Sequence, residues 1–208
     1  MTNVLLIPGA AGAAAFWDPV VERLPAAWQV RAIDLPGLGS VPAQPGVGSY
    51  DDLVDYVARR ITVPAAVVAQ SMGAFIALKL ALDHPHLVTY LVLVAATGGI
   101  DVARHGGTDW RADYAAAYPS AQPWARAAVP DLSERLATIS IPVLLIWPTD
   151  DILSPLSVAR SLTASIPSTS LVTFHSDDHW VIHRFPDESE AAIRSFIDGG
   201  ASPGQPRG

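Results

Sequence analysis

Short runs of β-branched and other apolar residues alternate along the chain with segments in which apolar residues recur at helical spacing. The apolar runs predict strands at 4–7, 29–34, 65–70, 90–95, 143–147 and 171–175. The segments between them predict helices at 16–23, 50–61, 73–82, 132–137, 155–165 and 187–197. This alternation is typical of βα units that build a mostly parallel sheet of about six strands, with helices on both faces.

The helix ends carry signals of their own. Ser49 is predicted to cap the helix at 50–61, with Asp51 and Asp52 in its first turn. Pro85 and Pro167 follow two other helix ends. In open parallel sheets ligands bind beyond the carboxyl ends of the strands. We therefore expect the chemistry of this protein in the loops at that edge.

Composition restricts the class of protein. Half of the 208 residues are hydrophobic, which predicts one domain over 1–198 with a substantial core. The formal net charge is −7, and no cluster of lysine and arginine is present, so we expect no nucleic-acid and no membrane partner. The chain contains no cysteine, which excludes disulfides, a thiolate nucleophile and thiolate metal ligands.

The two ends of the chain are expected to differ. The apolar stretch 4–17 is not preceded by positive charges, and Pro8, Gly9 and Gly12 interrupt it, so we interpret it as strand plus loop rather than signal peptide or membrane span. A cytoplasmic protein is expected. Residues 199–208 lack the apolar side chains that would offset the entropy of ordering, which predicts a flexible tail.

Ser71 is the best candidate nucleophile. The sequence A-Q-S-M-G at 69–73 lies between a predicted strand and a predicted helix. A serine on such a tight turn needs small residues two positions before and after it, and Ala69 and Gly73 meet this need. A serine in an ordinary strand-to-helix turn is the alternative. The segment resembles the G-x-S-x-G motif of the α/β-hydrolase family, with Ala69 in place of the first glycine.

This resemblance implies the α/β-hydrolase fold. It predicts the sheet order 4-3-5-6-7-8 in the family's strand numbering, without the family's first two strands, and a short cap at 97–130. The segment D-L-P-G-L-G-S at 34–40 is similar to the family's D-x-P-G-x-G-x-S loop. We assign a structural role to this loop.

A loop of small residues, I-P-G-A-A-G at 7–12, follows the first predicted strand. Its small side chains allow the backbone to approach a reacting carbonyl oxygen. The family resemblance implies that the oxyanion hole consists of the amides of Met72 and Ala10, with Ala11 as the neighbouring alternative to Ala10. A plain glycine-rich turn is the structural alternative.

A serine hydroxyl becomes a good nucleophile when an imidazole accepts its proton. His84 and His86 flank a helix end, where imidazoles interact with terminal carbonyls, and His105 lies in an irregular segment. His179 lies between the last predicted strand and the last predicted helix. Its segment resembles the family's G-H-x-x-x-x-E-x-P, which implies that His179 is the general base.

The imidazole requires a carboxylate that orients it. The segment W-P-T-D-D-I-L-S-P at 147–155 is similar to the family's W-G-x-x-D-x-x-x-P, which places the acid at Asp151. Asp150 is the competitor, and because adjacent loop residues point in different directions, only one should face the imidazole. Ser71, Asp151 and His179 then reproduce the family's chain order.

A metal site is the rival interpretation. His175, His179 and His183 have the spacing i, i+4, i+8, which would stack three imidazoles on one face of a helix. The β-like run 171–174 places His175 at a strand end instead, so we expect no metal. No G-x-G-x-x-G motif or P-loop is present, and we expect no cofactor.

Aromatic residues gather in the predicted cap and beside the predicted catalytic loops. Those in the cap either contact the substrate or only bury the cap on the body. The substrate contacts that we expect are Trp110, Trp147 and Trp180.

These features predict a serine hydrolase for a small, largely apolar carboxylic ester, thioester, lactone or amide, with an acyl-enzyme on Ser71. A serine at this position argues against the family's dehalogenases and epoxide hydrolases, which use a carboxylate there. Carbon–carbon bond hydrolases, lyases and cofactor-free haloperoxidases keep the serine and stay open as alternatives. A ligand receptor or signalling protein that retains the triad is the alternative of another class.

Overall fold

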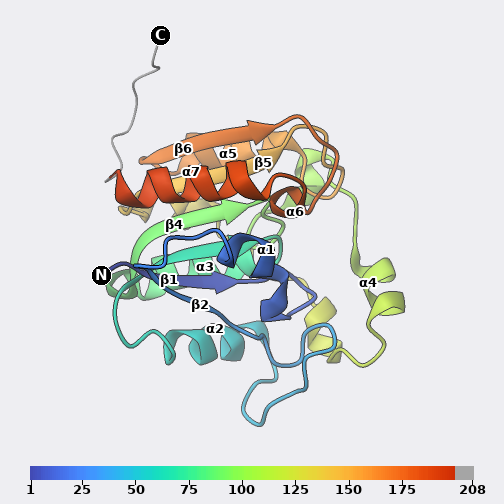
Figure 1. Cartoon of the computed structure of the whole chain (residues 1–208). Coiled ribbons are helices and arrows are strands. Elements are labelled where there is room, and N and C mark those ends of the chain that lie inside the picture. The colour runs from blue at the N-terminus through green and yellow to red at the C-terminus, as the bar shows by residue number, and fades with distance from the viewer. Residues whose placement is uncertain (200–208) are drawn as a thin grey trace.

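The computed structural model describes residues 1–199, and residues 200–208 of the predicted tail lie outside it. Six parallel strands form one sheet in the order β2-β1-β3-β4-β5-β6 (Figure 1). This is the order that the family resemblance implies, and it confirms the expected fold class. The strands are β1 (Asn3–Ile7), β2 (Gln29–Ala32), β3 (Ala65–Gln70), β4 (Val88–Val94), β5 (Val143–Pro148) and β6 (Thr169–Phe174).

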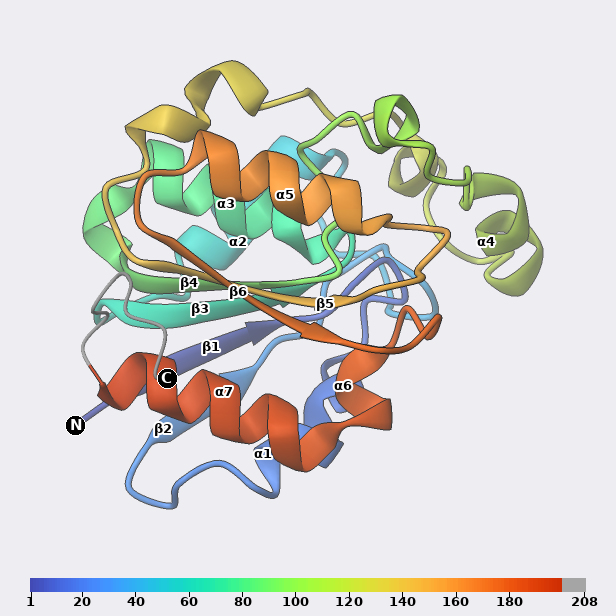
Figure 2. The same cartoon turned by 90° about the horizontal axis from the view of Figure 1, so that it is seen from above.

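Helices cover both faces of the sheet. Figure 2 shows α2, α3 and α5 on one face and α1, α6 and α7 on the other, while α4 lies beyond the carboxyl ends of the strands. No helix within residues 1–199 is long and apolar enough to cross a bilayer. The helices are α1 (Asp18–Val21), α2 (Tyr50–Ala58), α3 (Gly73–Asp83), α4 (Arg111–Ala117), α5 (Leu156–Ser165), α6 (Val181–Arg184) and α7 (Pro186–Asp198).

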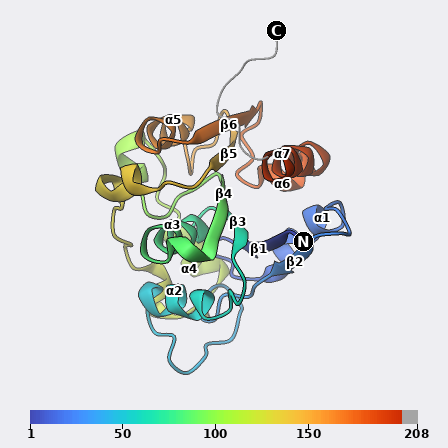
Figure 3. The same cartoon turned by 90° about the vertical axis from the view of Figure 1, so that its left-hand side faces the viewer.

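Two hydrophobic cores lie on opposite sides of the sheet, each between the sheet and the helices that cover that side in Figure 3. Successive side chains of a strand point to opposite faces, so Leu5 and Ile7 of β1 enter one core and Val4 and Leu6 the other. Every residue of β3 and β5 is buried, whereas the edge strands β2 and β6 are partly exposed. Burial on both faces explains why the inner strands are continuous apolar runs.

Two predicted helices differ in the structure. The segment predicted as a helix at 16–23 is a 3₁₀ turn, Ala14–Trp17, followed by the short α1. Pro19 lies in the first turn of α1, where a residue without an N–H starts a helix more readily than it continues one. The segment predicted as a helix at 132–137 forms 3₁₀ structure, Ser133–Thr138.

Two short helices were not predicted. α4 buries only Tyr114 among its residues, so it has no apolar periodicity. α6 has four residues, which is too short for any periodicity to be seen. Local sequence patterns predict the long elements because only these have a complete apolar face.

The predicted cap of α2 is present. The Ser49 hydroxyl accepts a hydrogen bond from the Asp52 amide at 3.1 Å and donates one to the Asp52 carboxylate at 2.8 Å. The Ser49 hydroxyl, followed by the Gly48 amide, holds the pKa of Asp52 below its ordinary value. The pair resembles a capping box, in which two polar groups at a helix start satisfy each other.

We predict that Ser49→Ala lowers the free energy of unfolding by about 1 kcal/mol, because it leaves an amide of the first turn unpaired. Ser161→Ala, in the middle of α5, is the control and should be neutral or slightly stabilising, since alanine has the higher helix propensity. Urea unfolding of both variants measures the difference. Equal stability of the two variants would contradict the capping role.

Candidate active site

Ser71 occupies a strained turn. It follows β3 directly, precedes α3, and has a φ of 52°, in the left-handed region. Such a conformation costs a residue with a side chain about 1–2 kcal/mol, so its surroundings must fix it. The Ser71 amide donates to the Val94 carbonyl at 2.9 Å, and the Ser71 carbonyl accepts from the amides of Ala74 and Thr97, each at 3.1 Å. The turn is therefore held by the end of β4 and by α3.

Close backbone packing explains the small residues around Ser71. A Cβ on Gly73 would lie 2.3 Å from the Pro8 carbonyl oxygen, so only glycine fits where α3 starts against the loop after β1. A Cβ on Gly9 would lie 2.4 Å from Oε1 of Gln70 and 3.1 Å from Cβ of Ser71. Ala69, at the position of the family's first glycine, is fully buried in the core.

The structure brings Ser71, His179 and Asp151 into one hydrogen-bonded chain. Oγ of Ser71 lies 2.8 Å from Nε2 of His179, and Nδ1 of His179 lies 2.6 Å from Oδ2 of Asp151. The other carboxylate oxygen of Asp151 accepts from the Leu153 amide at 2.8 Å. Because the acceptor-only carboxylate accepts a hydrogen bond from the N–H at Nδ1, Nε2 is left as an acceptor for the serine proton.

Asp150 faces a different direction. Its Oδ2 accepts from the Thr149 hydroxyl at 2.6 Å and lies 3.5 Å from Nδ1 of His175. Its side chain is exposed, whereas that of Asp151 is buried. The structure places Asp151, and not Asp150, against His179.

A turn with two side-chain hydrogen bonds presents His179. The hydroxyl of Ser176 accepts from the Asp178 amide at 3.0 Å, and the carboxylate of Asp178 accepts from the Trp180 amide at 2.8 Å. Such bonds from serine and aspartate to nearby amides stabilise turns. His179 therefore has a fixed backbone between β6 and α6.

The three histidines of the rival metal interpretation do not share a face. His175 follows β6 and is almost fully exposed. His183 lies on α6, and its Nε2 donates to the Phe16 carbonyl at 2.6 Å. Within residues 1–199 no group of three or more histidines or carboxylates could hold a metal ion.

The two amides expected to form the oxyanion hole lie next to the nucleophile. Met72 follows Ser71, and Ala10 follows Gly9, whose backbone packs against the Ser71 side chain. Among the hydrogen bonds within residues 1–199, none is donated by the amide of Ala10 or Met72. Both donors therefore remain for a ligand.

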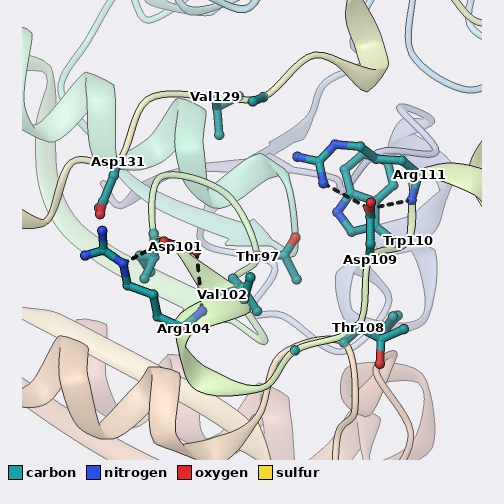
Figure 4. Close-up of a pocket in the computed structure, with 15 residues that line it drawn as sticks. Thr97, Asp101, Val102, Arg104, Thr108, Asp109, Trp110, Arg111, Val129 and Asp131 are labelled. Carbon is teal, nitrogen blue, oxygen red and sulfur yellow. Dashed lines mark hydrogen bonds and ion pairs between the residues drawn. The ribbon is translucent and has the colours of Figure 1, made fainter.

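A cavity of about 420 Å³ has Thr97 in its lining (Figure 4). It begins at Thr97, whose Oγ1 is 3.1 Å from Oγ of Ser71, and extends between the segment 97–130 and Leu153. Its lining carries several charged side chains, which the largely apolar ester expected from the sequence does not require. The charged side chains in this lining are Asp101 and Arg104, paired at 2.8 Å, Asp109 and Arg111, paired at 2.9 Å, and Asp131.

The three tryptophans expected to contact substrate have different positions. Trp110 lines the cavity, and Trp180 is 58% exposed. Trp147 is fully buried, and its indole N–H donates to the Ser154 carbonyl at 2.8 Å, so its expected contact with substrate is wrong. The reason is that its side chain points from β5 into the core; its nearness in sequence to Asp151 says nothing about that direction.

The segment 97–130 is tied to the body by buried hydrogen bonds. The Tyr114 hydroxyl accepts from the Gly39 amide at 2.7 Å, and the Tyr50 hydroxyl donates to the Ala125 carbonyl at 2.7 Å. Burial raises the pKa of both phenols, which keeps them neutral. Gly39 belongs to the loop at 34–40, so this loop anchors the segment.

Two polar residues near the site carry no sequence motif. Thr97 contacts the nucleophile, and the fully buried Ser154 donates its hydroxyl proton to the Ala96 carbonyl at 2.6 Å. Only their positions after strand ends could have pointed to them.

Comparisons with known proteins agree with this architecture. A family model described as alpha/beta hydrolase fold matches residues 2–130, more than half of the chain. A pimeloyl-[acyl-carrier protein] methyl ester esterase from Neisseria meningitidis serogroup C is 28% identical, and the match covers 95% of this chain and 94% of the relative.

Two solved structures are also similar. A thermophilic esterase from Thermogutta terrifontis has a TM-score of 0.79 at 20% identity, covering 97% of this chain and 91% of that one. A meta-cleavage product hydrolase from Pseudomonas fluorescens has a TM-score of 0.78 at 20% identity, covering 96% and 91%. These two likenesses concern the fold alone, because the identities are low. The family model matches more than half of the chain, and the solved structures share its fold. The chain therefore belongs to the alpha/beta hydrolase fold family.

Proposed function

We propose that this protein is a serine esterase that cleaves a small carboxylic ester through an acyl-enzyme on Ser71. The hydrogen-bonded chain from Ser71 through His179 to the buried Asp151 carries this proposal. The relatives support the coarser class, an esterase-type hydrolase, because a protein named as a methyl ester esterase matches over nearly the whole chain.

Each residue then has a defined role. His179 takes the proton of Ser71 as Oγ attacks the ester carbonyl, and Asp151 stabilises the imidazolium that forms. The amides of Ala10 and Met72 donate to the oxygen that becomes negative. His179 returns the proton to the departing alcohol, and water repeats the sequence on the acyl-enzyme to release the acid.

The fold alone does not select ester cleavage. A meta-cleavage product hydrolase and an esterase have nearly the same TM-score against this chain, so likeness of fold does not distinguish them. The sequence relatives favour the ester over the carbon–carbon bond and over a receptor role.

The cavity limits the substrate. Its volume of about 420 Å³ lies at the lower end of the range for small-molecule sites, which favours a short acyl or alcohol group. Apolar contacts come from Trp110, Val129 and Leu153. The bonds from Tyr114 and Tyr50 fix the cap to the body, so the site does not depend on a lid that opens at a lipid surface.

Ser71→Ala is expected to abolish ester hydrolysis, with a loss on the order of 10⁴-fold or more, because the nucleophile is removed. A fluorophosphonate probe should label the wild-type protein at Ser71 and leave the variant unlabelled, as read by peptide mass spectrometry. Ser161→Ala serves as the control and should be labelled normally. Labelling at another serine would overturn the proposed mechanism.

Asp151→Asn is expected to lower kcat by about 10³–10⁴-fold, because the amide no longer stabilises the imidazolium or fixes its tautomer. Asp150→Asn is the matched control, one position away and facing His175, and should keep most activity. Steady-state kinetics on one ester measures both. The reverse ranking would mean that Asp150 is the acid.

The chain-length preference should have an early maximum. Each added methylene contributes about 0.8 kcal/mol only while apolar wall remains to receive it. On p-nitrophenyl esters from acetate to palmitate, kcat/KM should rise over the short chains and then fall, without activation by micelles. A maximum at palmitate, or strong activation by micelles, would show that the anchored cap opens onto a long channel.

A further inference from the structure

Thr97 is a polar residue at the nucleophile to which the mechanism above gives no role. Its Oγ1 lies 3.1 Å from Oγ of Ser71, and its amide donates to the Ser71 carbonyl, also at 3.1 Å. Two contacts thus join the same pair of residues, one through the backbone and one through the side chains. The backbone contact holds Thr97 beside the serine turn.

The loop that carries Thr97 is strained and firmly held. Within residues 1–199 the only residues other than glycine with a positive φ are Ser71 and Ala95, which has a φ of 43°. The carbonyl of Ala96 accepts from the buried hydroxyl of Ser154 at 2.6 Å. A Cβ on Gly98 would lie 2.8 Å from the Met72 carbonyl oxygen, so the loop packs directly on the serine turn. Strain of this kind persists where the surrounding structure enforces it, and it is typical of functional sites.

The hydrogen bonds of the site determine which hydroxyl is the donor. The Nδ1–H of His179 donates to the carboxylate of Asp151, so Nε2 is an acceptor and the Ser71 hydroxyl donates its single proton to it. With its own proton committed to the imidazole, Ser71 can only accept from Thr97. The threonine hydroxyl therefore donates to the oxygen that performs the attack.

We propose that Thr97 is a further catalytic residue, whose hydroxyl stabilises negative charge on Oγ of Ser71. The proposal rests on the esterase mechanism above. In acylation the Oγ–carbon bond forms while the serine proton moves to Nε2 and the carbonyl π electrons move to the carbonyl oxygen; the carbonyl then re-forms as the bond to the alcohol oxygen breaks, and that oxygen takes the electron pair and the proton from Nε2. In deacylation water gives a proton to Nε2 as its oxygen bonds to carbon, the carbon–Oγ bond breaks, and its electron pair returns to Oγ, which takes that proton back from Nε2. Thr97 keeps its proton in both steps and donates to Oγ while that atom is most negative.

The test removes the Thr97 hydroxyl and then restores it. Thr97→Val keeps the branched shape without the hydroxyl and should lower kcat by about tenfold to a hundredfold with little change in KM, the loss expected for one hydrogen bond to a charged group. Burst kinetics on a p-nitrophenyl ester should show that both acylation and deacylation are slower. Thr97→Ser should recover most of the rate, and Thr163→Val, which removes a hydroxyl on α5 that donates to the Ala159 carbonyl, should not change it.

Thermal unfolding monitors whether each variant folds. If Thr97→Val does not fold, the comparison of Thr97→Ser with Thr97→Ala isolates the hydroxyl in the same way. Wild-type acylation and deacylation rates in Thr97→Val, or equal rates in the serine and alanine variants, would overturn the proposal. Ser71→Ala separates this failure from failure of the proposed function. If Ser71→Ala keeps its activity, the esterase mechanism itself is contradicted. If Ser71→Ala is inactive and Thr97→Val is unimpaired, only the proposed role of Thr97 is contradicted.

Discussion

The left-handed conformation of Ser71 is the constraint on which the rest of the site depends. The turn it forms lets α3 leave β3 at once, and the approach is so close that residues 9 and 73 have no room for a side chain. The strain is balanced by hydrogen bonds to the ends of neighbouring elements. Because all six strands are parallel, the loops after β1, β4, β5 and β6 lie at the same edge as this turn.

Buried hydrogen bonds support the loop that carries the Asp151 carboxylate. Trp147 in the core donates to the Ser154 carbonyl, and the Ser154 hydroxyl donates to Ala96 next to Thr97. The loop after β5, which carries Asp151, is thereby fixed to the loop after β4, which contacts Ser71. Each of these buried groups has a partner, so these bonds add rigidity without the cost of unpaired polar atoms. Trp147 thus stabilises the geometry of the site, although it has no exposed surface to offer a substrate.

The sequence predicts the sheet well because its inner strands are buried on both faces; β3 has the predicted bounds, 65–70. The residues proposed for catalysis could be found for a related reason: each lies in a loop that follows a strand whose end is visible in the pattern. The direction of Trp147 and the charged lining of the cavity could not be predicted. They depend on the face of the strand to which a side chain points and on loops that meet only in the folded chain. Neither property produces a periodic pattern in the local sequence. The broken helix near Pro19 shows that one residue can override an apolar pattern.

The charges of the cavity bear on the kind of acyl group that the proposed esterase would accept. Asp101 is paired with Arg104, and Asp109 with Arg111, and exposed pairs of this kind contribute only about 0–1 kcal/mol to stability. The pairing matters for a ligand because each arginine already has a carboxylate partner, so its positive charge is offset within the lining. Asp131 bonds to Ser133 and leaves the lining with an excess of negative charge. Under the proposed function, a neutral acyl group would avoid this repulsion, whereas the carboxylate product of ester cleavage would experience it, and its release would be favoured.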